Sequence, residues 1–79
     1  MRTYIPDMAE FFSWMEREEH SYVVLRGFLD FDKAYPAIGS KEDVDLLVED
    51  AALPHIHARY QAYRREQGVK CDVHHVSGS

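Results

Sequence analysis

The stretch that decides the fold reads Asp43-Val44-Asp45-Leu46-Leu47-Val48. It is mostly apolar and rich in β-formers, which predicts a strand. Strand side chains alternate between two faces and rise about 3.3 Å per residue, so the carboxylates of Asp43 and Asp45 share one face, about 6.6 Å apart at their backbones. Two like charges placed this way repel each other unless a cation or water screens them. The stretch therefore predicts a strand whose paired carboxylates are suited to grasping a metal ion.

The composition limits what can surround this strand. The chain has 79 residues, of which 46% are hydrophobic and 29% charged, as in a soluble globular protein. A domain of this size buries roughly 60–65% of its unfolded surface, so we expect a single domain, residues 1–79, with one modest core. The net charge of −5 argues against nonspecific binding to nucleic acid or anionic membrane, because such binding needs clustered Lys and Arg.

The cysteine count and the hydropathy pattern limit the cellular setting. A single cysteine, Cys71, excludes an internal disulfide and a Cys-rich zinc site. No apolar run approaches the roughly 20 residues of a membrane span, and the amino terminus lacks the order of a signal peptide. We therefore expect a cytoplasmic protein with no membrane contact.

The segment before residue 43 predicts a helix and a strand. Asp7 followed by Glu10 is typical of a capping box, and apolar residues then recur at helical spacing, which predicts a helix over 7–19. Tyr22-Val23-Val24-Leu25 is a run of β-formers and predicts a strand that ends at Arg26-Gly27. Residues 28–42 contain Pro, Gly and Ser without a clean period and predict a loop.

The segment after residue 48 predicts a second helix and a third strand. Leu53, Ile56, Tyr60 and Tyr63 trace one helical stripe, and Gly68 is placed as the left-handed stop of that helix. Residues 69–76 predict the last strand. The order is then α-β-β-α-β, an α/β (α+β) fold in which strands 43–48 and 69–76 lie parallel and adjacent in a three-stranded mixed sheet backed by helices. The chain ends at Gly78-Ser79 without a third helix, which is compatible with a catalytic-core fragment truncated at its carboxyl end.

A third carboxylate joins the first two in this arrangement. Asp72 alternates with the apolar Cys71 and Val73, so it faces away from the helices, as Asp43 and Asp45 do. Hard oxygen ligands suit Mg²⁺ or Mn²⁺, and such ions stabilise the attacking and leaving oxygens of phosphoryl-type displacements. An acidic protein would handle a nucleoside triphosphate only through such ions.

Three segments of the chain together resemble the nucleotidyltransferase superfamily typified by DNA polymerase beta. They are Tyr22-Val23-Val24-Leu25-Arg26-Gly27, Asp43-Val44-Asp45-Leu46-Leu47-Val48 and Cys71-Asp72-Val73-His74. The resemblance covers roughly residues 21–76. It looks closest to the bacterial branch associated with polysaccharide biosynthesis.

The resemblance implies a minimal nucleotidyltransferase-like fold and a role for each aspartate. In such a site Asp43 and Asp45 hold the metal ions that carry the nucleoside triphosphate, ATP or another, and Asp72 helps to bind the catalytic ion and to activate a hydroxyl acceptor. All three are thus expected to be both catalytic and metal-binding. The function implied is the Mg²⁺-dependent transfer of a nucleotidyl group to that hydroxyl.

The same resemblance implies where the phosphates lie. They are expected near the turn after the first strand, where Arg26 and Gly27 stand. Most members of the superfamily carry Gly-Ser directly after that strand, whereas here the internal Gly39-Ser40 lies just before Asp43, so we expect its backbone to line the phosphates.

Several plainer interpretations stay open. The aspartates would then only solvate an exposed sheet face, or the domain would be a non-catalytic relative that acts by protein association, for instance as a homo-oligomer with Trp14 at its surface. A small acidic mimic of nucleic acid is a third alternative. His74, on the face of Asp72, is a candidate to contact a phosphate or orient a carboxylate, while Cys71 is expected in the core, where an apolar setting raises the thiol pKa.

Overall fold

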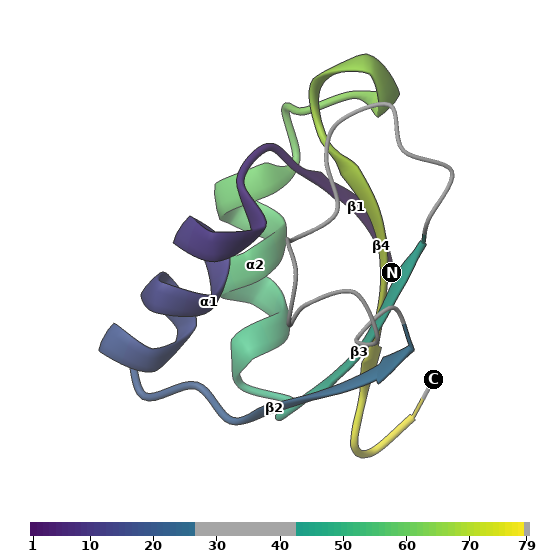
Figure 1. The fold of residues 1–79 in the computed structure, drawn as a ribbon. Coiled ribbons are helices and arrows are strands. Elements are labelled where there is room, and N and C mark those ends of the chain that lie inside the picture. Colours follow the sequence, from purple (N-terminus) through teal and green to yellow (C-terminus); the bar gives the residue numbers. More distant parts are fainter. Residues whose placement is uncertain (27–42, 79) are drawn as a thin grey trace.

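A computed structural model of the chain describes residues 1–26 and 43–78. Within these ranges two α-helices lie together on one side of a four-stranded mixed sheet (Figure 1). The elements in chain order are β1 (Arg2–Ile5), α1 (Met8–Arg17), β2 (Tyr22–Arg26), β3 (Val44–Val48), α2 (Ala52–Tyr60), the 3₁₀ turn η1 (Arg65–Gln67) and β4 (Val69–His75). Neither helix has the length and apolar character needed to cross a membrane.

The sheet has the strand order β1-β4-β3-β2. Strands β3 and β4 are parallel neighbours, as predicted for 43–48 and 69–76, with α2 in the connection between them. The two outer pairs, β1 with β4 and β2 with β3, are antiparallel. The prediction of three strands is wrong, because β1, only four residues long, adds an edge strand beside β4.

Helix α1 begins where the capping pattern predicts. The Asp7 carboxylate accepts a hydrogen bond from the Glu10 backbone N–H at 3.0 Å and so caps the first turn. The helix ends at Arg17, two residues before the predicted end. Glu19 adopts a left-handed conformation with φ of 56°, and the His20 N–H donates to the Met15 carbonyl at 2.8 Å, which turns the chain toward β2.

Helix α2 is shorter than its apolar stripe predicts. It ends at Tyr60, so Tyr63 lies beyond it and is 40% exposed instead of packing in the core.

The predicted left-handed stop at Gly68 is wrong, because Gly68 has φ of −158°, an extended backbone conformation. Gly68 is needed for another reason. A Cβ at that position would lie 2.7 Å from the Ile5 nitrogen and the Tyr4 carbonyl carbon, so the backbone of β1 leaves no room for a side chain.

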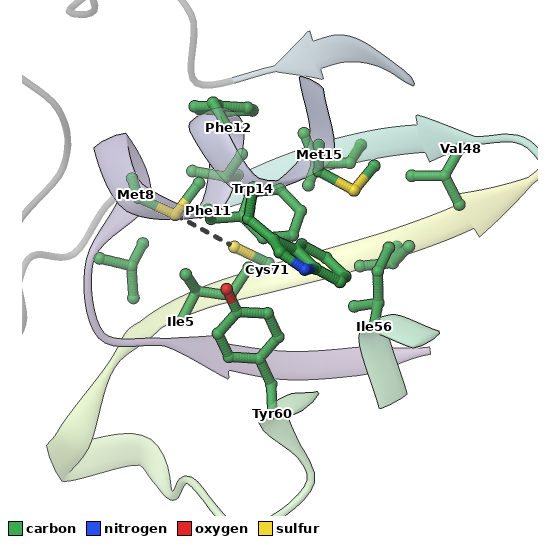
Figure 2. Close-up of a cluster of buried hydrophobic side chains, with 14 of the residues drawn as sticks. Ile5, Met8, Phe11, Phe12, Trp14, Met15, Val48, Ile56, Tyr60 and Cys71 are labelled. Atoms are coloured by element: carbon green, nitrogen blue, oxygen red, sulfur yellow. Dashed lines mark hydrogen bonds between the residues drawn. The ribbon is translucent and has the colours of Figure 1, made fainter. Parts of the chain in front are cut away.

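The core lies between the helices and the inner face of the sheet. Alternate residues of β3 and β4 are buried there, namely Val44, Leu46, Val48, Val69, Cys71 and Val73. Phe11, Trp14 and Tyr60 pack against this face from the helices (Figure 2). Trp14 is only 7% exposed and belongs to this core, so the alternative in which it marks a partner surface is wrong.

Candidate functional site

The three predicted aspartates lie on the sheet face opposite the helices. Burial alternates along β3 and along β4 as far as His74, so Asp45 and Asp72 point away from the core, and Asp43 does the same directly before β3. We call Asp43, Asp45 and Asp72 the acidic face. Its orientation agrees with the prediction made from the two-residue period.

The register of the sheet sets two of these carboxylates side by side. Asp45 and Asp72 are direct partners across the parallel β3–β4 pair, and neighbouring strands are about 4.8 Å apart. On the outer strands, Arg2 is the partner of Asp72 and Arg26 is the partner of Asp45. The backbone register thus forms a row across all four strands, with two acids in the middle and an arginine position on each edge strand.

Protein cations contact two members of the acidic face. The Lys70 Nζ lies 3.2 Å from Asp43 Oδ2, and the Arg2 Nε donates to Asp72 Oδ1 at 3.2 Å. All four side chains are partly exposed. Ion pairs of this kind contribute only about 0–1 kcal/mol to stability, so they hold the carboxylates in place weakly.

Asp45 is the most buried member of the acidic face. Its side chain is 13% exposed, and the His74 Nε2 lies 3.9 Å from its Oδ1. His74 therefore lies on the face of Asp72, as predicted, and close to the Asp45 carboxylate, while its role toward a phosphate or a carboxylate stays a prediction. His75, its neighbour in sequence, turns elsewhere and pairs with Asp50 at 3.3 Å.

The pKa of the Cys71 thiol is affected by the charges of the acidic face on the other side of the sheet. The thiol is buried on the core side, with its Sγ 3.7 Å from the Met8 Sδ (Figure 2). Burial, and then the negative charges of Asp72, Asp43 and Asp45, raise the pKa of Cys71 to about 12. The raised pKa of the thiol is therefore due mainly to its burial, and the nearby carboxylates add to that effect.

The donor chemistry of the acidic face fits a hard divalent cation. Carboxylate oxygens are the ligands that Mg²⁺ and Mn²⁺ prefer. In residues 1–26 and 43–78, no three His, Cys, Asp or Glu side chains are already arranged around a common metal position, and Asp43 and Asp72 turn toward Lys70 and Arg2 instead. Binding an ion therefore requires side-chain rotation that breaks only weak surface pairs.

The predicted phosphate-binding residues fall mostly outside the described ranges. Gly27, Gly39, Ser40 and the predicted loop 28–42 lie there. Arg26 is the last residue of β2, and its backbone pairs with Asp45 after an irregularity in the register that follows Val24. Their role toward phosphates stays a prediction.

Sequence reasoning missed two cations of the site, Arg2 and Lys70. Lys70 stands two residues before Asp72, so the period of two that placed Asp72 on the outer face was sufficient to find it. Arg2 had no such signal, because its place beside Asp72 depends on the unpredicted strand β1.

A separate cavity of about 290 Å³ opens on the helical side of the sheet. Its lining is Pro6, Asp7, Glu10, Arg59, Tyr60 and Tyr63. Arg59 pairs with Glu10 and stacks over Trp14 at 4.7 Å, and Asp7 caps α1. The charges at this cavity thus already serve the packing of α1 against α2.

Fold and site together define a small α+β protein with a carboxylate-rich sheet face. Comparison of the chain with protein-family models, with curated proteins and with solved structures found no match.

Proposed function

We propose that the chain is a Mg²⁺-dependent nucleotidyltransferase-like domain that transfers a nucleotidyl group from a nucleoside triphosphate to a hydroxyl acceptor. The observation that carries the proposal is the in-register pair Asp45 and Asp72 on adjacent parallel strands, with Asp43 on the same face. The mixed sheet with both helices on one side is in keeping with the fold that the sequence resemblance implies.

The residues of the acidic face have two roles in this proposal. Asp43 and Asp45 would hold the ion that accompanies the triphosphate. Asp72 would help to hold the catalytic ion and would take the proton of the acceptor hydroxyl as its oxygen bonds to the α-phosphorus and pyrophosphate leaves. When bound, Mg²⁺ neutralises phosphate charge and supports in-line displacement. The chain carries a net charge of −5 and would repel a free polyphosphate, so nucleotide binding should depend strictly on the cation.

Calorimetry of nucleotide binding tests the proposal. We expect the folded protein to bind at least one of the four common nucleoside triphosphates in Mg²⁺ and to lose that binding in EDTA. Asp45→Asn and Asp72→Asn should each weaken it about tenfold or more, as expected for removing a charged partner of a bound ion. Glu66→Gln, which removes the same charge from the exposed turn η1, should leave it unchanged.

Two results would count against the proposal. One is a natively folded protein, judged by circular dichroism, that binds none of the four nucleotides in Mg²⁺ or Mn²⁺. The other is binding that Asp45→Asn and Glu66→Gln weaken equally, because that would make general charge and not the acidic face responsible.

A second candidate function is association with another protein through strand β2. Val23 and Leu25 are 56% and 49% exposed, a high value for large apolar side chains on a strand. Light scattering after size-exclusion chromatography tests it. A stable oligomer that dissociates in a Val23→Lys variant, together with no nucleotide affinity, would favour association, whereas a monomer that binds nucleotide would remove it.

A further inference from the structure

Two cations, Lys70 and Arg2, contact the acidic face. We propose that Lys70 and Arg2 are phosphate-binding residues, which pair with Asp43 and Asp72 only until a divalent cation takes over those carboxylates. This inference rests on the proposed function and adds to it the groups that would recognise the triphosphate.

Both cations are fixed to the acidic face by the sheet. Lys70 stands two residues before Asp72 on β4, and its Nζ reaches Asp43 Oδ2 at 3.2 Å. Arg2 is the register partner of Asp72 on β1, and its Nε lies 3.2 Å from Asp72 Oδ1. One cation therefore contacts the first predicted ligand, and the other contacts the third.

These two ion pairs contribute little to stability, so their release costs little. Each joins partly exposed side chains, with Lys70 34% and Arg2 55% exposed, and such pairs contribute about 0–1 kcal/mol. The attachment of β1 to β4 is secured instead by four backbone register pairs and by the fully buried Ile5. Releasing the two cations would therefore leave the sheet intact.

The chemistry of the released groups suits phosphate. Arg presents a planar fork that binds phosphate oxygens in pairs, and Lys is a mobile ammonium on a flexible stem. Arg17 and Arg59 approach Glu10 on the helical side of the molecule, and Arg64 and Arg65 lie at the exposed turn η1. A divalent ion between the carboxylates would thus free two positive groups at the place where the negatively charged triphosphate arrives.

If a divalent cation displaces Lys70 and Arg2 from the carboxylates, substituting either residue should change the affinities for metal and for nucleotide in opposite directions. Lys70→Met and Arg2→Met each remove a competitor of the metal, so the affinity for Mn²⁺ alone should rise by up to about fivefold, the equivalent of one surface pair. The affinity for the nucleoside triphosphate in saturating Mg²⁺ should fall about tenfold to hundredfold, the effect of losing one hydrogen bond to a charged group. Arg65→Gln, a charge loss at the exposed turn η1, is the matched control and should change neither.

Mn²⁺ binding by electron paramagnetic resonance and nucleotide binding by calorimetry give the two affinities without any assay of turnover. Lys70→Met carries the test by itself if Arg2→Met fails to fold. Wild-type protein that binds Mn²⁺ and nucleotide, with variants that bind both as tightly as wild type, would overturn this inference and leave the proposed function standing. Variants that lose both affinities together with thermal stability would assign the two cations a structural role only. Wild-type protein that binds neither ligand would remove the proposed function first.

Discussion

Gly68 is the clearest case of a side chain excluded by a neighbouring backbone. A Cβ there would lie 2.7 Å from atoms of both Tyr4 and Ile5, and backbone atoms cannot rotate away as a side chain can. We expect Gly68→Ala to lower the free energy of unfolding by about 2–3 kcal/mol, the upper range for overpacking, because it pushes β1 away from the η1 turn. Urea denaturation followed by circular dichroism measures this loss.

Gly78 provides the matched control for that substitution. A Cβ on Gly78 would have the His75 Cε1 at 3.7 Å as its nearest neighbour, which is an ordinary contact. Gly78→Ala should therefore stay within about 0.5 kcal/mol of wild type, as surface substitutions usually do. Equal stability losses in the two variants would show that the approach of β1 is not what Gly68 permits.

Cys71 links the pH dependence of stability to the acidic face. The pKa of its thiol is raised from 9.0 to about 12 in the folded protein, so between these values the folded state retains a proton that the unfolded state has lost. The contribution of the Cys71 thiol to the free energy of unfolding is fully present below pH 9. It is lost as the pH rises from 9 through 12, with a slope of at most about 1.4 kcal/mol per pH unit.

The Cys71→Val variant isolates this contribution. Valine keeps an apolar side chain in the core but cannot lose a proton, so the decline in unfolding free energy between pH 9 and 11 should be shallower than in wild type. Tyr and Lys residues titrate in both proteins and cancel in the difference. Two parallel profiles would mean that the thiol is not held protonated by burial and by the three aspartates.

Helix α1 shows why some elements follow directly from sequence. Its start depends on a contact three residues away, between Asp7 and the Glu10 N–H, and such local contacts are visible in the sequence. Asp7→Ala should cost about 0.5–2 kcal/mol of stability, while Asp7→Asn should keep most of it, because asparagine also accepts the bond. Chemical denaturation of the two variants checks the difference, and equal losses would assign the effect to charge instead of capping.

Strand β1 shows why other elements cannot be predicted from local sequence. Its four residues carry little pattern of their own, and they become a strand because they pair with residues 69–72 of β4 at the other end of the chain. The end of α2 also depends on distant parts of the fold. The apolar stripe continues to Tyr63, yet the helix stops at Tyr60 because the chain must reverse through η1 to enter β4 parallel to β3. Both features depend on long-range pairing, which periodicity does not record.

The candidate site also has some features that local sequence predicts and others that depend on long-range strand pairing. The three aspartates could be placed on one face from sequence, since alternation and the parallel β3–β4 pairing are enough. The pairing of Asp72 with Arg2 required β1. The in-register contact of Asp45 with Asp72 required the exact register, and a shift by one residue would have turned one of them into the core.

The proposed metal binding would stabilise the molecule as a whole. A ligand that binds only the folded state stabilises it by about 2.7 kcal/mol at one hundred times its dissociation constant. In a domain of this length 1 kcal/mol moves the melting temperature by about 4–8 °C, so saturating Mg²⁺ should raise it by about 10–20 °C if the acidic face binds the ion. Differential scanning calorimetry with a titration of MgCl₂ measures this rise.

Ionic strength has to be separated from specific binding in that experiment. The chain has a net charge of −5, so any salt relieves some self-repulsion, and NaCl at matched ionic strength gives the size of that general effect. Asp45→Asn should retain the NaCl response and lose the additional rise in MgCl₂, because it removes a proposed ligand from the centre of the β3–β4 pair. If MgCl₂ and NaCl raise the melting temperature of wild-type protein equally, the three carboxylates only solvate the open face of the sheet.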